Sequence, residues 1–310
     1  MIQTASKWKR GFTLVEILIV IAILGVIMGV VYSVYLTHQK SAYTQEEVVE
    51  VQQNLRIAME SITKDIRMAG MLVPSTTPPI AAASTDSISL NMASARGVYA
   101  MIDETPDMSA VAGIADKVAF KVKSSGDVDV FKENRGNPVR LIRPIDCTQP
   151  ISATFSIYTS NGGTTRSMTL QKPALFASGD SIKRGDMIAM TETGAPDPNT
   201  VKYSVVNGGT VVNSVTCPQN QKCLVRIANC TDADATCYTN GTSNIIAGNI
   251  SNLQFSYMLN DSSETDTPTD LGAIRAVRVT ITGQTSSTSL LSGGPKTRQL
   301  TSVMKIRNRR

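Results

Sequence analysis

Apolar and polar positions divide the chain into three parts, of which the first is the most distinctive. Residues 12–36 are apolar or uncharged except for Glu16, and the cations Lys7, Lys9 and Arg10 precede them. A helix of this length rises about 37 Å, enough to cross the hydrocarbon core of a bilayer. The run is too long for the core of a secretory signal peptide, and a buried soluble helix is rarely apolar on every face. The pattern predicts a membrane-spanning helix with a cytoplasmic N-terminus.

Residues 37–70 keep the helical period, but apolar side chains now occupy a single stripe. These recur at spacings of three and four: Val48, Val51, Leu55, Ala58, Met59, Ile62, Ile66 and Ala69. No proline interrupts the segment, and Gly70 is placed as a helix C-cap. We therefore expect one continuous helix from Phe12 to Ala69, with Asp65 and Arg67 on the exposed side of the stripe.

The remainder, residues 86–310, shows short strand patterns after a Pro/Ser/Thr/Ala-rich linker at 71–85. The strand candidates are 86–92, 117–123, 152–158, 166–170, 186–191, 201–206, 210–216 and 222–228. Turn signals separate them at 125–127, 161–163 and 207–209, and the last is expected to join two valine-rich strands as a hairpin.

Strict alternation of apolar residues is clearest in the last third of the chain. One side of each expected strand carries the following residues: Leu253, Phe255, Tyr257 and Leu259; Val277, Val279 and Ile281; Leu300, Ser302, Met304 and Ile306. Three such strands form an antiparallel sheet with one buried face, and the amphipathic helix is its natural cover. The expected fold class is α+β, a long N-terminal helix packed on an antiparallel β-sheet head.

Residues 11–25 (GFTLVEILIVIAILG) closely resemble the processing signal of type IV prepilins and of type II secretion pseudopilins. The resemblance implies a leader at residues 1–11, cut after Gly11 by a membrane prepilin peptidase. Phe12 would become the N-methylated mature N-terminus. A glycine fits the scissile position because no Cβ blocks the approach of the protease backbone.

The resemblance also assigns a role to Glu16, which would pair with the Phe12 amine of a neighbouring subunit during filament assembly. A charge left unpaired in a low dielectric is costly, so this pairing would select the correct axial register. The spacing of Gly25 and Gly29 fits close helix packing in the membrane, or the two glycines are incidental. The implied partners are other major and minor pilins and an inner-membrane assembly platform.

Two further stretches resemble PilW-type minor pilins. One is Asp65-Ile66-Arg67-Met68-Ala69-Gly70 at the expected end of the helix; the other comprises the expected C-terminal strands at 274–279 and 305–308, which also resemble the J-type pseudopilin. The leading hypothesis is a minor pilin with a periplasmic head, which primes assembly or sits near a filament tip and has a possible adhesive role. A minor pseudopilin of a type II secretion system is the close alternative. A membrane-anchored periplasmic receptor is the alternative from another class.

Five cysteines are present, and the predicted topology places them outside the cytoplasmic membrane, where disulfides persist. Cys217, Cys223, Cys230 and Cys237 lie close together in the sequence, while Cys147 stands apart. Their spacing favours a disulfide-stapled loop over a zinc site, and it leaves the three connectivities of the four clustered cysteines open. Cys147 is either free and buried or joined to the cluster.

The search for other chemistry narrows the function further. Residues 260–270 form an acidic loop in which Asp261, Glu264, Asp266 and Asp270 are weak calcium candidates, but the EF-hand pattern is absent. A formal charge of +5, including the leader cations, does not indicate a nucleic-acid partner. The single histidine, His38, has no clustered partner, and no nucleotide-binding or hydrolase motif is present. We therefore expect a structural subunit without a cofactor rather than an enzyme.

Overall fold

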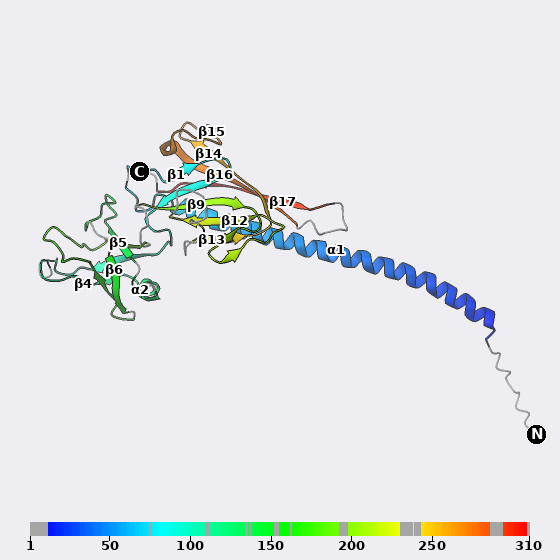
Figure 1. Cartoon of the computed structure of the whole chain (residues 1–310). Coiled ribbons are helices and arrows are strands. Elements are labelled where there is room, and N and C mark those ends of the chain that lie inside the picture. The colour runs from blue at the N-terminus through cyan, green and yellow to red at the C-terminus, as the bar shows by residue number, and fades with distance from the viewer. Residues whose placement is uncertain are drawn as a thin grey trace, which may run out of the picture.

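A single long helix projects from a β-rich head (Figure 1). The computed structural model describes residues 12–74, 76–108, 112–133, 136, 138–151, 155–161, 163–191, 198–229, 238, 243–285 and 294–308. Helix α1 spans Leu14–Met68, 55 residues or about 80 Å. The continuous helix predicted from Phe12 to Ala69 is confirmed to within two residues. Its first buried residue is Val51, and most of the helix before that residue is exposed.

The end of α1 is defined by a glycine that no other residue could replace without strain. Gly70 has a φ of +74°, and its amide donates to the Asn91 carbonyl at 2.8 Å. A Cβ at this position would lie 2.7 Å from the Asn308 carbonyl oxygen and 2.9 Å from Pro79 Cγ. The helix therefore stops where the C-terminus and the first strand segment meet it.

Two antiparallel sheets share one hydrophobic core with the second half of α1. The five-stranded sheet has the order β1 (Ile80–Ala83), β2 (Ile88–Met92), β9 (Asn199–Val206), β12 (Cys223–Ala228) and β13 (Asn244–Ala247). The four-stranded sheet has the order β15 (Glu264–Thr265), β14 (Ile250–Leu259), β16 (Ile274–Gln284) and β17 (Thr297–Lys305). The α+β fold class, and the helix as cover of the C-terminal strands, are confirmed, because α1 packs on β16 and β17.

A closed six-stranded barrel is inserted between β2 and β9 and has a hydrophobic core of its own. Its strand order is β3 (Tyr99–Glu104), β4 (Lys117–Val122), β7 (Ser167–Gln171), β6 (Phe155–Asn161), β5 (Pro138–Ile142) and β8 (Met187–Met190). Figure 1 shows the barrel at the end of the head that lies away from the helix N-terminus. The sequence predicted four of these strands but not their closure, which depends on β3 and β5.

Two predicted turns need correction. Residues 125–127 do not form a turn but begin α2 (Ser125–Glu133), whose Val128 and Phe131, three residues apart, are buried in the barrel core. At 207–209 a turn is present, with the Thr210 amide donating to the Asn207 carbonyl at 3.3 Å, but the flanking strands do not pair. Strand β9 is already paired with β2 and β12, so β10 (Val211–Val212) pairs with β11 (Val215–Thr216) instead.

Two buried tyrosines and one partly buried tyrosine make the head sensitive to alkaline pH. Burial raises the pKa of Tyr99 to about 12, and it also raises the pKa of Tyr203 and Tyr257. The pKa of an unfolded tyrosine is about 10, so their contribution to stability is complete below that pH and falls as the pH rises toward 12. We expect the urea midpoint of unfolding to fall steeply between pH 10 and about 12, and less steeply in Tyr99→Phe. An unchanged slope in that variant would contradict the assignment to Tyr99.

Candidate assembly site

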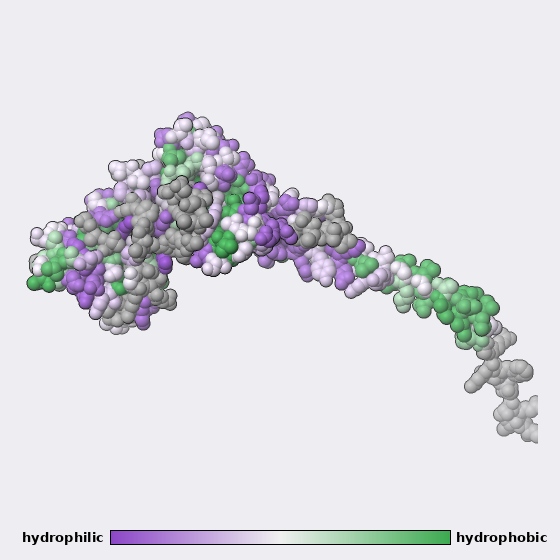
Figure 2. All heavy atoms as spheres, viewed as in Figure 1, coloured by the Kyte–Doolittle hydropathy of each residue, from purple (hydrophilic) through white to green (hydrophobic). Residues whose placement is uncertain are grey.

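The most exposed apolar surface of the described chain is the N-terminal half of α1. The large apolar side chains at residues 12–35 are each about half or more exposed, and no described part of the head covers them. Figure 2 shows this hydrophobic band at the end of the helix that lies away from the head. By length and composition α1 is also the one described helix able to cross a membrane. An apolar surface of this size needs lipid or other helices around it.

Glu16 is the one carboxylate on this surface, and it lies in the first turn of α1. Thr13 is the N-cap: its backbone amide and hydroxyl donate to Glu16 Oε2 at 2.8 and 3.0 Å, and its hydroxyl accepts from the Glu16 amide at 3.2 Å. This reciprocal capping box satisfies donors that the first helical turn leaves free. It also holds the carboxylate beside the backbone of Phe12 and Thr13, close to where a new amine would lie after cleavage following Gly11, which is outside the described residues.

Gly25 and Gly29 lie on the same exposed segment. Apart from the adjacent residues and the backbone of α1 itself, no atom of the described chain lies within 4 Å of a Cβ built at either position. The fold of the single chain therefore gives neither glycine a packing role. Their use in helix–helix contact stays a prediction.

Asp65 is buried, which corrects the prediction that it lies on the exposed side of the stripe. Its side chain accepts from Arg226 Nε at 2.6 Å and from the Tyr203 hydroxyl at 2.8 Å, and Arg226 Nη2 donates to the Ala95 carbonyl at 2.6 Å. These contacts join α1 to strands β9 and β12. The sequence spacing could have indicated this burial, because Asp65 follows Ala58 by seven residues and Ile62 by three and so lies on the same face of the helix. Arg67 is exposed, as predicted.

The predicted disulfide in the cysteine-rich loop is present, and it joins the first two cysteines of the cluster. Cys217 and Cys223 form a disulfide, Cys147 is free and buried, and Cys230 and Cys237 lie outside the described residues. A non-reducing peptide map is expected to link Cys217 to Cys223, and Cys217→Ser/Cys223→Ser should lower the free energy of unfolding by about 2 kcal/mol. Cys147→Ala is the control, since its disulfide map should be unchanged. A link from Cys217 to Cys230 or Cys237 would contradict the pairing.

The acidic loop does not converge on a metal site. Asp261 accepts from Ser263, Glu264 pairs with Arg278 at 3.0 Å, and the Asp270 side chain accepts from the Gly272 amide. Asp266 joins no group of three or more potential metal ligands among the described residues. Each carboxylate with a contact thus serves its own part of the hairpin rather than a shared cation.

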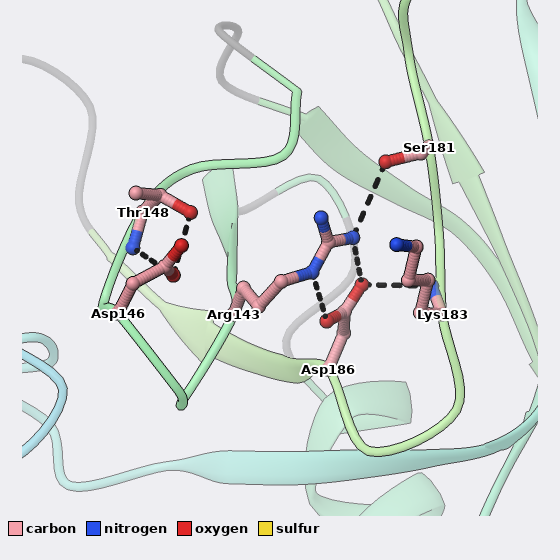
Figure 3. Close-up of polar contacts among 6 residues, drawn as sticks. All are labelled: Arg143, Asp146, Thr148, Ser181, Lys183 and Asp186. Atoms are coloured by element: carbon pink, nitrogen blue, oxygen red, sulfur yellow. Dashed lines mark hydrogen bonds and ion pairs between the residues drawn. The ribbon is translucent and has the colours of Figure 1, made fainter.

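A polar cluster around the buried Asp186 of the barrel could be mistaken for a catalytic group (Figure 3). Arg143 donates to both carboxylate oxygens of Asp186 at 3.0 Å and to the Ser181 hydroxyl at 3.2 Å, and the Lys183 amide donates to Asp186 at 2.8 Å. The neighbouring Asp146 bonds only locally to Thr148, as Figure 3 also shows. Both oxygens of Asp186 are occupied by fixed donors, so the cluster joins β5 to the loop before β8 and offers no free nucleophile or base.

Comparison with known proteins supports the interpretation of the N-terminus. Residues 9–32 match the family described as the prokaryotic N-terminal methylation motif. The chain is also 39% identical over 62 residues to the pilin-like protein PilA3 of Thermus thermophilus, an alignment that spans 20% of this chain and 27% of that protein. No solved structure matches the chain.

The methylation motif lies on the exposed apolar end of α1, which contains Glu16, and the rest of the helix packs on antiparallel sheets. Together with the Thermus relative, these features support a type IV pilin-like protein.

Proposed function

We propose that the protein is a minor pilin, a structural subunit that inserts into the membrane through α1 and enters a type IV filament through the same helix. The observation that carries this proposal is the uncovered apolar half of α1 with one carboxylate in its first turn. Lipid surrounds this surface before assembly, and helices of neighbouring subunits replace the lipid in the filament. The cations at Lys7, Lys9 and Arg10 favour a cytoplasmic N-terminus and a periplasmic head.

We further propose that a prepilin peptidase cuts after Gly11 and that the Phe12 amine is then methylated. Protein isolated from its host should begin at Phe12 and be heavier by one methyl group, as measured by intact-protein and N-terminal peptide mass spectrometry. Gly11→Val should retain residues 1–11, because a branched side chain blocks close approach of the protease backbone. A wild-type protein that keeps residues 1–11 would contradict the pilin proposal and support a membrane-anchored receptor.

The position near a filament tip rests on the shape of the head. The inserted barrel enlarges the head at the end that lies away from the helix N-terminus (Figure 1). A subunit repeated along a filament must fit copies of itself on every side, whereas a subunit at the tip is free on its outer side. An enlarged outer end therefore suits the tip, where it would prime assembly or contact a surface.

Electron microscopy with gold-labelled antibodies against the head tests this position. Label at one end of sheared filaments would support a tip subunit, and label along their whole length would contradict it. Deletion of the gene separates a pilus from a type II secretion system, which the N-terminal signal does not distinguish. Loss of surface filaments with intact protein secretion supports the pilus, and the reverse result supports the pseudopilin alternative.

A further inference from the structure

A polar pocket lies at the membrane-facing end of the head, at the opposite end from the barrel. Its volume is about 500 Å³, and it is open to solvent and lined by the stapled loop, the turn at 207–209, the start of β14 and the end of β16. Asn249 in its wall approaches Glu50 of α1 at 3.4 Å, next to Val51, the first buried residue of the helix. This volume is within the range of small-molecule binding sites in proteins.

Side-chain amides dominate the lining of the pocket. The six carboxamide residues are Asn207, Gln219, Asn220, Gln221, Asn249 and Gln284. Lys222 is the only charged residue among the described lining residues, and no aromatic ring is among them. Carboxamides are neutral and offer both donors and acceptors, so they match ligands whose groups also donate and accept.

Two constraints restrict movement in one wall of the pocket. The disulfide closes the loop from Cys217 to Cys223, and a Cβ at Gly208 would collide with the carbonyl oxygens of Pro218 and Gln219. The backbone of the 207–209 turn therefore lies very close to the backbone of the stapled loop. The next residue, Gly209, adds a hydrogen bond, because its amide donates to the Cys217 carbonyl at 2.8 Å. A preformed site loses less conformational entropy on binding than a flexible one.

Backbone groups in the wall are already used by the fold. The Asn249 amide donates to Gln221 Oε1 at 2.8 Å, the Ile250 amide to the Lys222 carbonyl at 3.1 Å, and the Gln284 amide to the Asn249 carbonyl at 2.9 Å. These donors are not available to pair with an added peptide strand, which binds mainly through its main chain. Recognition is therefore left to side chains.

Four of the carboxamides make no side-chain hydrogen bond within the described chain: Asn207, Gln219, Asn220 and Gln284. Each offers two N–H donors and one carbonyl acceptor to a ligand. Vicinal hydroxyls and acetamido groups of a sugar present the complementary donors and acceptors at similar density. A polyanion would need more cations than Lys222, and an apolar ligand would leave these amides without partners.

We propose that this pocket binds a short hydroxyl-rich saccharide. Lys222 would contact a carboxylate if the sugar carries one. Without an aromatic ring for the sugar face to stack on, we expect affinity in the millimolar range. Two sources share this chemistry, the cell-wall glycan around a periplasmic head and the neutral glycans of an external surface.

Saturation-transfer NMR on the full chain tests the proposal, in dodecylphosphocholine micelles because sugar-based detergents would compete. The probes are cellobiose, N,N′-diacetylchitobiose and N-acetylglucosaminyl-N-acetylmuramic acid. We expect saturable transfer to at least one probe, and a loss of about fivefold in affinity for each carboxamide removed in Asn220→Ala and Gln284→Ala. Gln299→Ala, an exposed amide on β17 outside the pocket, is the matched control and should bind normally.

The ranking of the probes identifies the source. Cell-wall glycan is indicated if the muramic-acid disaccharide binds most strongly of the three probes and if Lys222→Ala weakens the binding of this probe but not of the other two. Preference for the uncharged disaccharides, with no effect of Lys222→Ala, indicates a neutral glycan. Absence of transfer to all three probes, or transfer that Asn220→Ala/Gln284→Ala leaves unchanged, would overturn the proposal without affecting the assignment as a pilin.

Discussion

Glu16→Ala is expected to reduce incorporation of the protein into sheared filaments by roughly 100-fold while leaving membrane insertion intact. In the proposed filament, the Phe12 amine of one subunit pairs with Glu16 of its neighbour inside a bundle of apolar helices. Removing the carboxylate leaves a buried cation without its counter-charge, at a cost of about 3 kcal/mol. Quantitative immunoblotting of sheared filaments against the membrane fraction measures the effect.

The capping box supplies a competing explanation and a matched control. Glu16 accepts two hydrogen bonds from Thr13, and loss of such a cap costs about 1 kcal/mol. Glu16→Gln keeps an acceptor for Thr13 but removes the charge, whereas Thr13→Val removes the hydroxyl and keeps the charge. If the charge pair governs assembly, the glutamine variant fails like the alanine variant and Thr13→Val assembles. Normal assembly of Glu16→Gln would assign the effect to the cap and remove the register role.

Asp65→Ala is expected to destabilise the head by about 3–5 kcal/mol, the cost of leaving the largely buried Arg226 without its ion-pair partner. Total stabilities of protein domains are about 5–15 kcal/mol, so this is a large loss. The melting temperature should fall by on the order of 10 °C. Thermal unfolding of the full chain in micelles, followed by near-ultraviolet circular dichroism, measures it.

Two variants separate burial of charge from a general helix effect. Lys64→Ala changes the exposed residue next to Asp65 on α1 and should stay within about 0.5 kcal/mol of the wild type. Asp65→Leu/Arg226→Met removes both charges together and should recover much of the loss, because no unpaired ion is left in the core. A double variant as unstable as Asp65→Ala would show that the hydrogen bonds to Tyr203 and Ala95, rather than the charge balance, hold α1 to the sheet.

Hydrophobic periodicity was sufficient to predict those elements in which each face of the helix or strand has one consistent environment, either buried or exposed. The run after Phe12 is apolar on all faces, and the stripe from Val51 to Ile66 repeats at helical spacing, so the helix and its two halves could be predicted. Strands β14 and β16 alternate over residues 253–257 and 277–283, with Phe255 and Val279 fully buried on the core side. Their sheet, and the helix that covers it, could be predicted for the same reason.

The barrel and the turn corrections had no such local signal. Strand β5, which the sequence pattern did not predict, begins at Pro138 and does not alternate between buried and exposed positions along its length. Residues 125–127 have turn composition, and only the burial of Val128 and Phe131 against the barrel strands makes them the start of a helix. Closure of a barrel depends on which distant strands pair, and local patterns do not carry that information.

The sequence by itself determined the long apolar N-terminal half of α1 and its methylation motif, because these signals are local. Hydrophobic periodicity also determined the extent of α1. Only the tertiary structure decided that Asp65 is buried, that the barrel closes between β2 and β9, and that Cys223 pairs with Cys217. It also brought carboxamides from residues 207 to 284 into one pocket. Most of these features join residues that are far apart in the chain. The contacts between such residues stabilise the protein only once the core is packed, so local sequence patterns do not reveal them.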